Sequence, residues 1–281
     1  MISSKAILTG LASAVWLAAT PASAQQSSCT REALHAAAQS YVAAQTAGDP
    51  ARMNLTDQPR YVEELSGASL SEGILTKAQK IDHHLTIVDP QTCQTFTEVA
   101  ITDPAHPYVL GTRLKLEADR ISEIETFVTD QDDWLFDAEN TARYAAAEDW
   151  GVMPEAKRSD RTTLIAAANA YLDLFNDPDV EVPWGTPCAR LEGGIYTAKG
   201  RPDDSCNVGV PAGVEITDRR FIVDEELNAV VALVVFGKNK VPDSHLFRLE
   251  NGKLRYIHTI TVCRSFNCGY PLPAQLRERR Q

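Results

Sequence analysis

The stretch "LRYIHTITV" (254–262) places a histidine close to a tyrosine within an apolar strand pattern. Alternation along a strand puts Tyr256 and His258 on one face, among aliphatic side chains. An imidazole on an apolar wall has a shifted pKa and could act as a general acid or base. We therefore take His258 as the candidate catalytic residue, with Tyr256 assisting. The alternative is a core histidine that one hydrogen bond satisfies.

A second polar group lies in "CARLEGG", where Arg190 and Glu192 are two residues apart and share a face if the segment is a strand. They could pair at the rim of a pocket or orient a polar group of a substrate; a surface salt bridge is the alternative. Glu192 or Asp218 could assist His258 in proton transfer. Trp184, in "VPWGTP", could wall or cover a cavity, and ordinary packing explains it equally well.

Two tempting motifs fail on geometry. Asp243, Ser244 and His245 are consecutive, so on a strand they cannot converge as a catalytic triad requires. His83 and His84 fail as a metal pair for the same reason. The sequence contains no glycine-rich phosphate loop and no specific metal-ligand spacing, so we expect neither a cofactor nor a metal.

The elements that must position these residues occur twice. "REALHAAAQSYVAAQTAGD" (31–49) and "RTTLIAAANAYLDLFNDPD" (161–179) share Arg, Leu, three Ala and Tyr at the same offsets. Three further matches follow in the same order: "GILT" with "GIYT", "IDHHLTIVD" with "ITDRRFIVD", and "LEADRISEIETFV" with "LENGKLRYIHTITV". The chain is therefore a tandem repeat, with modules at 25–129 and 161–270.

Each module reads as a helix followed by strands, an α+β pattern. "NAVVALVVFG" (228–237) is apolar on both faces and predicts a central, covered strand. Asn251-Gly252 predicts a hairpin turn, and Ala118-Asp119 lies at the matching place in the first module. Glu125 is the counterpart of His258 there, and we expect it to contact a ligand.

The segment between the modules, 130–160, contains Trp134, Phe136 and Trp150. A flexible linker rarely contains so many large aromatic side chains, because these side chains are usually buried. We expect it to contain a short helix and to lock the two modules together.

The first 24 residues are typical of a secretory signal peptide, with a short basic start, the apolar stretch 6–19, and Ala22-Ser23-Ala24 before the expected cleavage point. No other segment approaches the roughly 20 apolar residues of a membrane helix. We therefore expect a secreted protein without a membrane partner, and Asn54 in "NLT" as a glycosylation acceptor on a surface loop.

Export favours disulfides for the six cysteines. Among several possible connectivities we favour Cys29 with Cys93, Cys188 with Cys206, and Cys263 with Cys268. The formal net charge of −11 argues against nucleic acid as a partner. The basic run "RERR" falls in a solvated tail, 271–281.

The Ala-rich helix, the mid-module Gly-Ile-x-Thr and the long terminal hairpin resemble the SnoaL-like branch of the nuclear-transport-factor-2-like (NTF2-like) superfamily. "NDPDVEVPWGTPCARLEGGIYT" and "PDSHLFRLENGKLRYIHTITV" also look like a family of secreted, mostly fungal proteins of undefined function. The resemblance implies two tandem cones, each a helix packed in a curved antiparallel sheet. It also implies an intramolecular pseudo-dimer, present as a monomer or a homodimer.

Members of that superfamily include isomerases, cyclases, lyases, dehydratases and non-catalytic binders. The first hypothesis is thus a secreted, cofactor-independent enzyme of lyase, isomerase, cyclase or hydratase type, acting on a small organic molecule in the second module. The second hypothesis is a secreted protein that binds a small ligand without changing it. A pocket in which His258 reaches a carboxylate would favour the enzyme.

Overall fold

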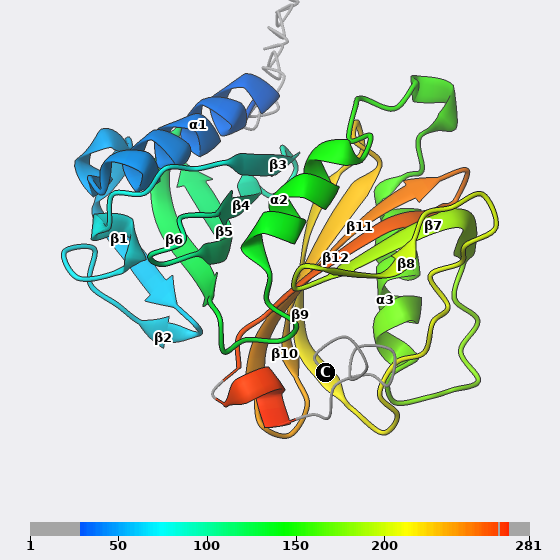
Figure 1. The fold of residues 1–281 in the computed structure, drawn as a ribbon. Helices are drawn as coiled ribbons and strands as arrows, with labels where there is room; N and C mark the ends of the chain where they lie inside the picture. The colour runs from blue at the N-terminus through cyan, green and yellow to red at the C-terminus, as the bar shows by residue number, and fades with distance from the viewer. Residues whose placement is uncertain (1–28, 264, 270–281) are drawn as a thin grey trace, which may run out of the picture.

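The computed structural model describes residues 29–263 and 265–269. The expected signal peptide (1–24) and tail (271–281) lie outside them. The described residues form three α-helices and two curved six-stranded sheets (Figure 1), which makes the chain an α+β protein.

The first half of the chain (29–129) begins with helix α1 (Arg31–Ala47). Its strands are β1 (Leu55–Glu63), β2 (Ser66–Gly67), β3 (His83–Asp89), β4 (Gln94–Ile101), β5 (Tyr108–Glu117) and β6 (Arg120–Thr129). The strand order in the first sheet is β2-β1-β6-β5-β4-β3. Only β1 and β6 run parallel within it.

The second half (161–269) repeats this arrangement. Helix α3 (Arg161–Asp173) precedes β7 (Trp184–Glu192), β8 (Ile195–Lys199), β9 (Ile216–Asp224), β10 (Ala229–Phe236), β11 (Val241–Glu250) and β12 (Lys253–Thr261). The strand order in the second sheet is β8-β7-β12-β11-β10-β9, with β7 and β12 parallel. Strand for strand, this is the order of the first sheet, as a tandem repeat requires.

The two long hairpins turn where the sequence predicts. Asn251 and Gly252 have φ of 53° and 73°, and Ala118 and Asp119 have φ of 48° and 62°. Two consecutive left-handed residues give the type I′ turn, whose twist matches that of the flanking strands. These turns join β11 to β12 and β5 to β6, and so connect the strands that carry Tyr256, His258 and Glu125.

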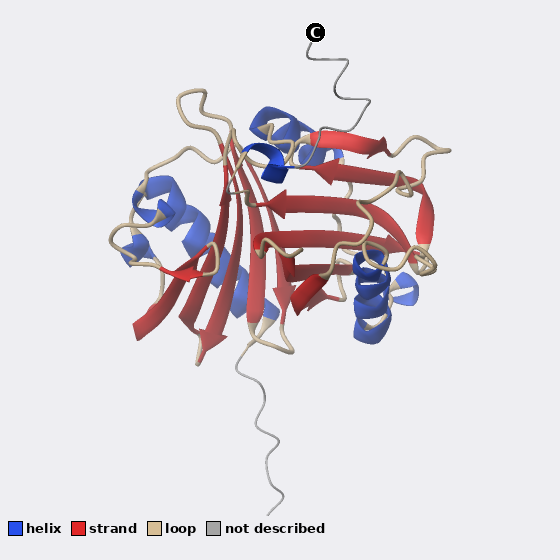
Figure 2. Ribbon diagram, turned by 90° about the horizontal axis from the view of Figure 1, so that it is seen from below, coloured by secondary structure: helices blue, strands red, loops and turns tan. Residues whose placement is uncertain are grey.

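The core has three layers of side chains. One lies between α1 and the first sheet, one between α3 and the second sheet, and one between the two sheets. Strand β10 belongs to two of them: Val230 and Val234 pack on the α3 side, whereas Val231 and Leu233 pack toward the first sheet. Figure 2 shows the two sheets meeting in the middle of the molecule, with their strands crossing. The prediction of a strand covered on both faces is confirmed.

Matched residues of the repeat make reciprocal ion pairs between the halves. Arg31, at the start of α1, bonds Asp224 at the end of β9, with N–O distances of 2.8 and 3.0 Å. Arg161, at the start of α3, bonds Asp89 at the end of β3, at 2.9 and 3.0 Å. Each carboxylate also accepts a backbone N–H from the opposite half. Such a residue-for-residue exchange is the pattern of a two-fold interface.

The connecting segment forms the expected short helix, α2 (Ala138–Ala147), which packs on β3, β4 and β5 of the first sheet and on β8 of the second. Thr141 donates a hydrogen bond to the carbonyl of Gly193 at 2.9 Å. Gly193 has a φ of 61°, and a Cβ there would lie 2.0 Å from the carbonyl oxygen of Trp134. Only glycine permits this approach, which joins the segment to the second sheet.

Three disulfides join Cys29 to Cys93, Cys188 to Cys206, and Cys263 to Cys268, the pairing favoured from the sequence. None of the helices in the described part of the chain is long and apolar enough to cross a bilayer.

Candidate functional site

A cavity of about 360 Å³ opens in the second half, within the size range of small-molecule sites. Its wall is formed by the second sheet, the loop 208–211, the connecting segment and Phe175, which lies just after helix α3. Its apolar lining includes Trp134, Phe175, Val210, Phe236 and the Cys268 end of the third disulfide. Its polar lining is Arg190, Glu192, Asp243, His245, Thr259 and Thr261.

Arg190 and Glu192 face this cavity from β7 and are paired with each other. The Nη2 of Arg190 donates to Oε1 of Glu192, and Nη1 donates to the carbonyl of Gly209 at 2.9 Å. Both side chains are less than a tenth exposed. The sequence placed these two on one face, and the structure gives them a buried pair beside a cavity in place of a surface salt bridge.

Asp243 and His245 face the same cavity from β11. The Nδ1 of His245 lies 3.2 Å from Oδ2 of Asp243, although the two atoms make no hydrogen bond. The other carboxylate oxygen accepts from the hydroxyl of Thr261 at 2.9 Å, which fixes the orientation of Asp243. The imidazole ring lies against the rings of Tyr171 and Phe247, with centroids 5.4 and 5.9 Å away. The result is a carboxylate–imidazole pair held on an aromatic wall.

Polar atoms without a hydrogen-bond partner concentrate at this cavity. Among the described residues, the buried atoms that lack one include Arg190 Nε, Asp243 Oδ2, His245 Nδ1 and Thr259 Oγ1, all on cavity-lining residues, and the hydroxyl of neighbouring Tyr171. Leaving a buried polar group unpaired costs about 1–3 kcal/mol. Several in one cavity are therefore expensive for folding until water or another bound molecule pairs with them.

The first half provides an internal comparison. By strand register Glu63 and Thr126 correspond to Glu192 and Thr259, and Thr112 takes the place of His245. There the hydroxyl of Thr112 donates to Tyr41 at 2.7 Å and lies 3.1 Å from that of Thr126. The equivalent polar groups of the first half thus satisfy one another, whereas those of the second half do not.

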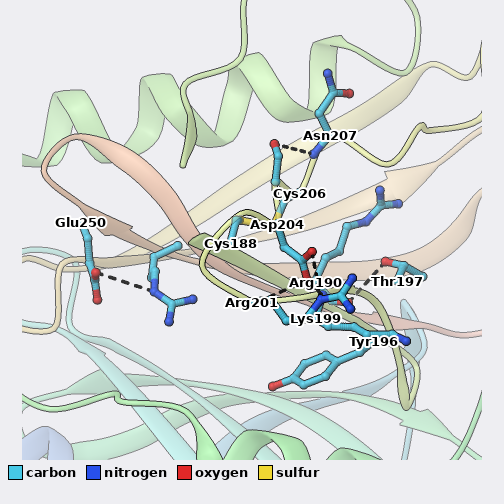
Figure 3. Close-up of a disulfide and its surroundings, with 12 residues drawn as sticks. Cys188, Arg190, Tyr196, Thr197, Lys199, Arg201, Asp204, Cys206, Asn207 and Glu250 are labelled. Atoms are coloured by element: carbon cyan, nitrogen blue, oxygen red, sulfur yellow. Dashed lines mark hydrogen bonds and ion pairs between the residues drawn. A yellow bond between two sulfur atoms is a disulfide. The ribbon is translucent and has the colours of Figure 1, made fainter. Parts of the chain in front are cut away.

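The Cys188–Cys206 disulfide supports one wall of the cavity. Cys188 precedes Arg190 by two residues on β7 and is bonded to Cys206 (Figure 3). Three residues after Cys206, the carbonyl of Gly209 accepts from Arg190. Lys199 and Arg201 hold the same loop through their backbone N–H groups, which donate to Asp204. The loop is therefore tied down on both sides of the disulfide.

His258 and Tyr256 do not line this cavity, contrary to the expectation from the sequence. Their face of β12 packs against the first sheet, and Thr259 and Thr261 on the opposite face reach the cavity. The alternation of side chains along β12 correctly put Tyr256 and His258 on one face of the strand. Both faces of β12 are buried, however, so the alternation could not show which of them lines a cavity.

His258 instead forms an ion-paired cluster between the sheets. Its Nδ1 lies 3.0 Å from Glu98 on β4, and its Nε2 lies 2.6 Å from Glu148 in the connecting segment. Tyr196 and Trp150 each donate a hydrogen bond to Glu148, at 2.7 and 3.0 Å. Burial opposes the charge, but the carboxylates of Glu148 and Glu98 outweigh it and raise the pKa of His258 to about 10. The imidazole thus reaches two carboxylates, as the enzyme hypothesis asked, but it does so between the two sheets and not among the residues that line the cavity.

Three further expected site residues lie elsewhere. Asp218 is exposed on β9, three strands from β12 or about 14 Å along the sheet, so it cannot assist His258. Trp184 is absent from the cavity lining and packs 5.9 Å from the ring of Tyr171. Glu125 is buried where the two halves meet and bonds Arg113 of the first half and Arg220 of the second. Burial opposes the charge of Glu125, yet these two cations lower its pKa.

Asn54 is exposed, and its side-chain amide donates to the carbonyl of Asp119 at 3.1 Å. This position is compatible with the surface location expected of a glycosylation acceptor.

Asp243 and His245 are the site residues that the sequence reasoning set aside. The triad was correctly rejected, because Ser244 faces the opposite side of β11. The two-residue spacing in "PDSHLF" nevertheless puts the carboxylate and the imidazole on one face, and this spacing was the signal that could have identified them.

Within the described residues, no group of three or more His, Cys, Asp or Glu side chains could hold a metal ion.

Comparison with known proteins adds one match. No curated protein and no solved structure matches this chain. A family model described as a domain of unknown function (DUF8021) matches residues 157–261. The matched segment runs from just before α3 to the end of β12 and so contains most of the residues that line the cavity.

Proposed function

We propose that the cavity of the second half binds a small organic molecule and that the chain is a secreted, cofactor-independent enzyme working by proton transfer. In this proposal each half is an NTF2-like module, and the two form an intramolecular pseudo-dimer. The supporting observation is the set of buried polar atoms around this cavity that have no hydrogen-bond partner among the described residues. Their counterparts in the first half are hydrogen-bonded to one another. The three disulfides and the N-terminal pattern support export.

The chemistry follows from the pair on β11. In its neutral form, His245 would take a proton from the substrate, and the neighbouring Asp243 would stabilise the imidazolium that results. The Nε hydrogen of Arg190, which has no partner among the described residues, would donate to a substrate oxygen that gains negative charge. Return of the proton to another atom completes an isomerisation, and loss of a leaving group completes an elimination.

A non-catalytic binding protein is the second candidate. The observation in its favour is that Asp243 and His245 approach to 3.2 Å without a hydrogen bond, so the acid–base pair is not assembled in this state. Binding without turnover needs only the cavity and its polar atoms.

Exchange of carbon-bound protons separates the two candidates. The ketone 1-phenylpropan-2-one has an apolar ring and acidic α-protons, whose exchange in D₂O is followed by NMR. The wild-type protein should accelerate this exchange, and His245→Gln should lose about 10²-fold of the acceleration. His84→Gln, a change at an exposed histidine of the first half, serves as the control. Equal rates for His245→Gln and wild type would exclude the mechanism, and binding without any exchange would favour the non-catalytic protein.

A further inference from the structure

The charges that line the cavity are not balanced. Arg190 is the cation among its described lining residues, while Glu192 and Asp243 are carboxylates. With a neutral His245 the formal charge of this set is −1, and with a protonated His245 it is zero. In neither state does the lining offer a cation that lacks an anionic neighbour.

Arg190 is the residue that would normally recognise an anion. Arginine binds a carboxylate or phosphate through two parallel N–H groups. Here Glu192 and the Gly209 carbonyl each accept a hydrogen bond from one of its terminal nitrogens, and the Nε hydrogen has no partner among the described residues. Glu192 thus already neutralises the guanidinium, and an incoming anion would meet the negative charge of Glu192 beside it.

Asp243 has the opposite character. Its Oδ1 accepts from Thr261, and its Oδ2 lies 3.2 Å from Nδ1 of His245 without a hydrogen bond to it or to any other described residue. A buried carboxylate oxygen in this situation is stabilised by a hydroxyl or an ammonium group. The rest of the wall, with Trp134, Phe175 and Phe236, suits an apolar ring.

We infer that Glu192 determines the charge selectivity of the cavity: by occupying Arg190 it excludes carboxylates and other anions. The site then takes neutral or cationic molecules that combine an apolar ring with a hydroxyl, carbonyl or amino group. This inference rests on the proposed small-molecule site. It adds to it the class of molecule that the site accepts.

Three probes of nearly equal shape test the inference: phenethylamine, 2-phenylethanol and phenylacetate. Binding to the full protein is measured by isothermal titration and by ligand-observed NMR. Wild type should bind the amine and the alcohol, and should bind phenylacetate at least about tenfold more weakly, because like charges meet in a buried site. Glu192→Gln, which removes the charge that holds Arg190, should strengthen phenylacetate binding by at least about tenfold and weaken binding of the amine.

Two further variants complete the design. Glu63→Gln alters the equivalent carboxylate of the first half and should leave all three affinities unchanged. Asp243→Asn should lose affinity for the amine and keep affinity for the alcohol. The wild-type ratio of affinities for phenethylamine and phenylacetate tests the charge selectivity even where a variant fails to fold.

The outcomes distinguish the two levels of the proposal. Phenylacetate bound by wild type as tightly as phenethylamine, or unchanged ratios in a folded Glu192→Gln, overturns the charge selectivity and leaves the small-molecule site standing. Failure of all three probes to bind the folded wild type contradicts the site itself, and with it the selectivity.

Discussion

At His258, burial and charge act in opposite directions. The side chain is 2% exposed, which disfavours an imidazolium, yet Glu98 and Glu148 contact both ring nitrogens. The two carboxylates outweigh burial and raise the pKa of His258 to about 10. The ring therefore links β12, β4 and the connecting segment, three elements that come from different parts of the chain.

This cluster makes stability depend on pH. A group whose pKa is raised on folding contributes fully below its unfolded pKa, here near 6.5, and that contribution is lost as the pH rises through about 10. We expect His258→Gln to cost about 3–5 kcal/mol near pH 6, because it leaves two buried carboxylates without a cation. The cost should shrink toward pH 10. Urea unfolding of both proteins at about pH 6, 8 and 10 measures it; a constant difference across this range would contradict the assignment.

At the scale of elements, the loop that follows β8 is part of the site. The Cys188–Cys206 disulfide holds this loop beside Arg190, and the loop's Gly209 accepts from that guanidinium. A disulfide that closes a loop of this length contributes about 3 kcal/mol. Its removal should therefore affect both stability and the cavity wall.

The Cys188→Ser/Cys206→Ser double variant should lose about 3 kcal/mol of stability and bind 2-phenylethanol several-fold more weakly, since one wall of the cavity is no longer held. Cys29→Ser/Cys93→Ser, which opens a disulfide of the first half, is the matched control. It should lose stability and keep its affinity. Thermal unfolding and titration with the alcohol provide the two measurements, and equal affinity losses in both variants would show that the effect is not local.

Most of the elements could be predicted from the sequence, because local patterns specify them. The repeated helix, the Asn251-Gly252 turn and the apolar run that became β10 each have a nearby physical cause. The placement of the site could not be predicted in the same way. His258 meets Glu98 across 160 residues of sequence, and alternation on β12 says which side chains share a face but not what that face packs against.

The whole molecule is held by contacts that exchange equivalent residues between the halves. Arg31 with Asp224 and Arg161 with Asp89 join the beginning of each helix to the end of a strand in the opposite half. Both carboxylates are nearly inaccessible to solvent, so each depends on its arginine and on backbone N–H groups. The apolar layer between the sheets, the His258–Glu98 contact and the Glu125–Arg220 pair also join the halves.

Because the two ion pairs are equivalent, removing either arginine should lower the stability by a similar amount. Arg31→Ala and Arg161→Ala should each destabilise the protein by about 3 kcal/mol, since each leaves a buried carboxylate without its cation. Lys80→Ala, which breaks an exposed pair with Asp82, should have a much smaller effect, because solvent screens this pair. Chemical denaturation of the three variants tests this. A large cost for only one of the two arginines would show that the two contacts are not equivalent.

The join through α2 has a consequence for how the protein behaves on dilution. Two separate subunits fall apart when their concentration drops below the dissociation constant, whereas partners on one polypeptide keep a fixed local concentration. The contact between the sheets therefore persists at any dilution. A single chain at very low concentration would keep its buried glutamates, its paired sheets and its cavity intact.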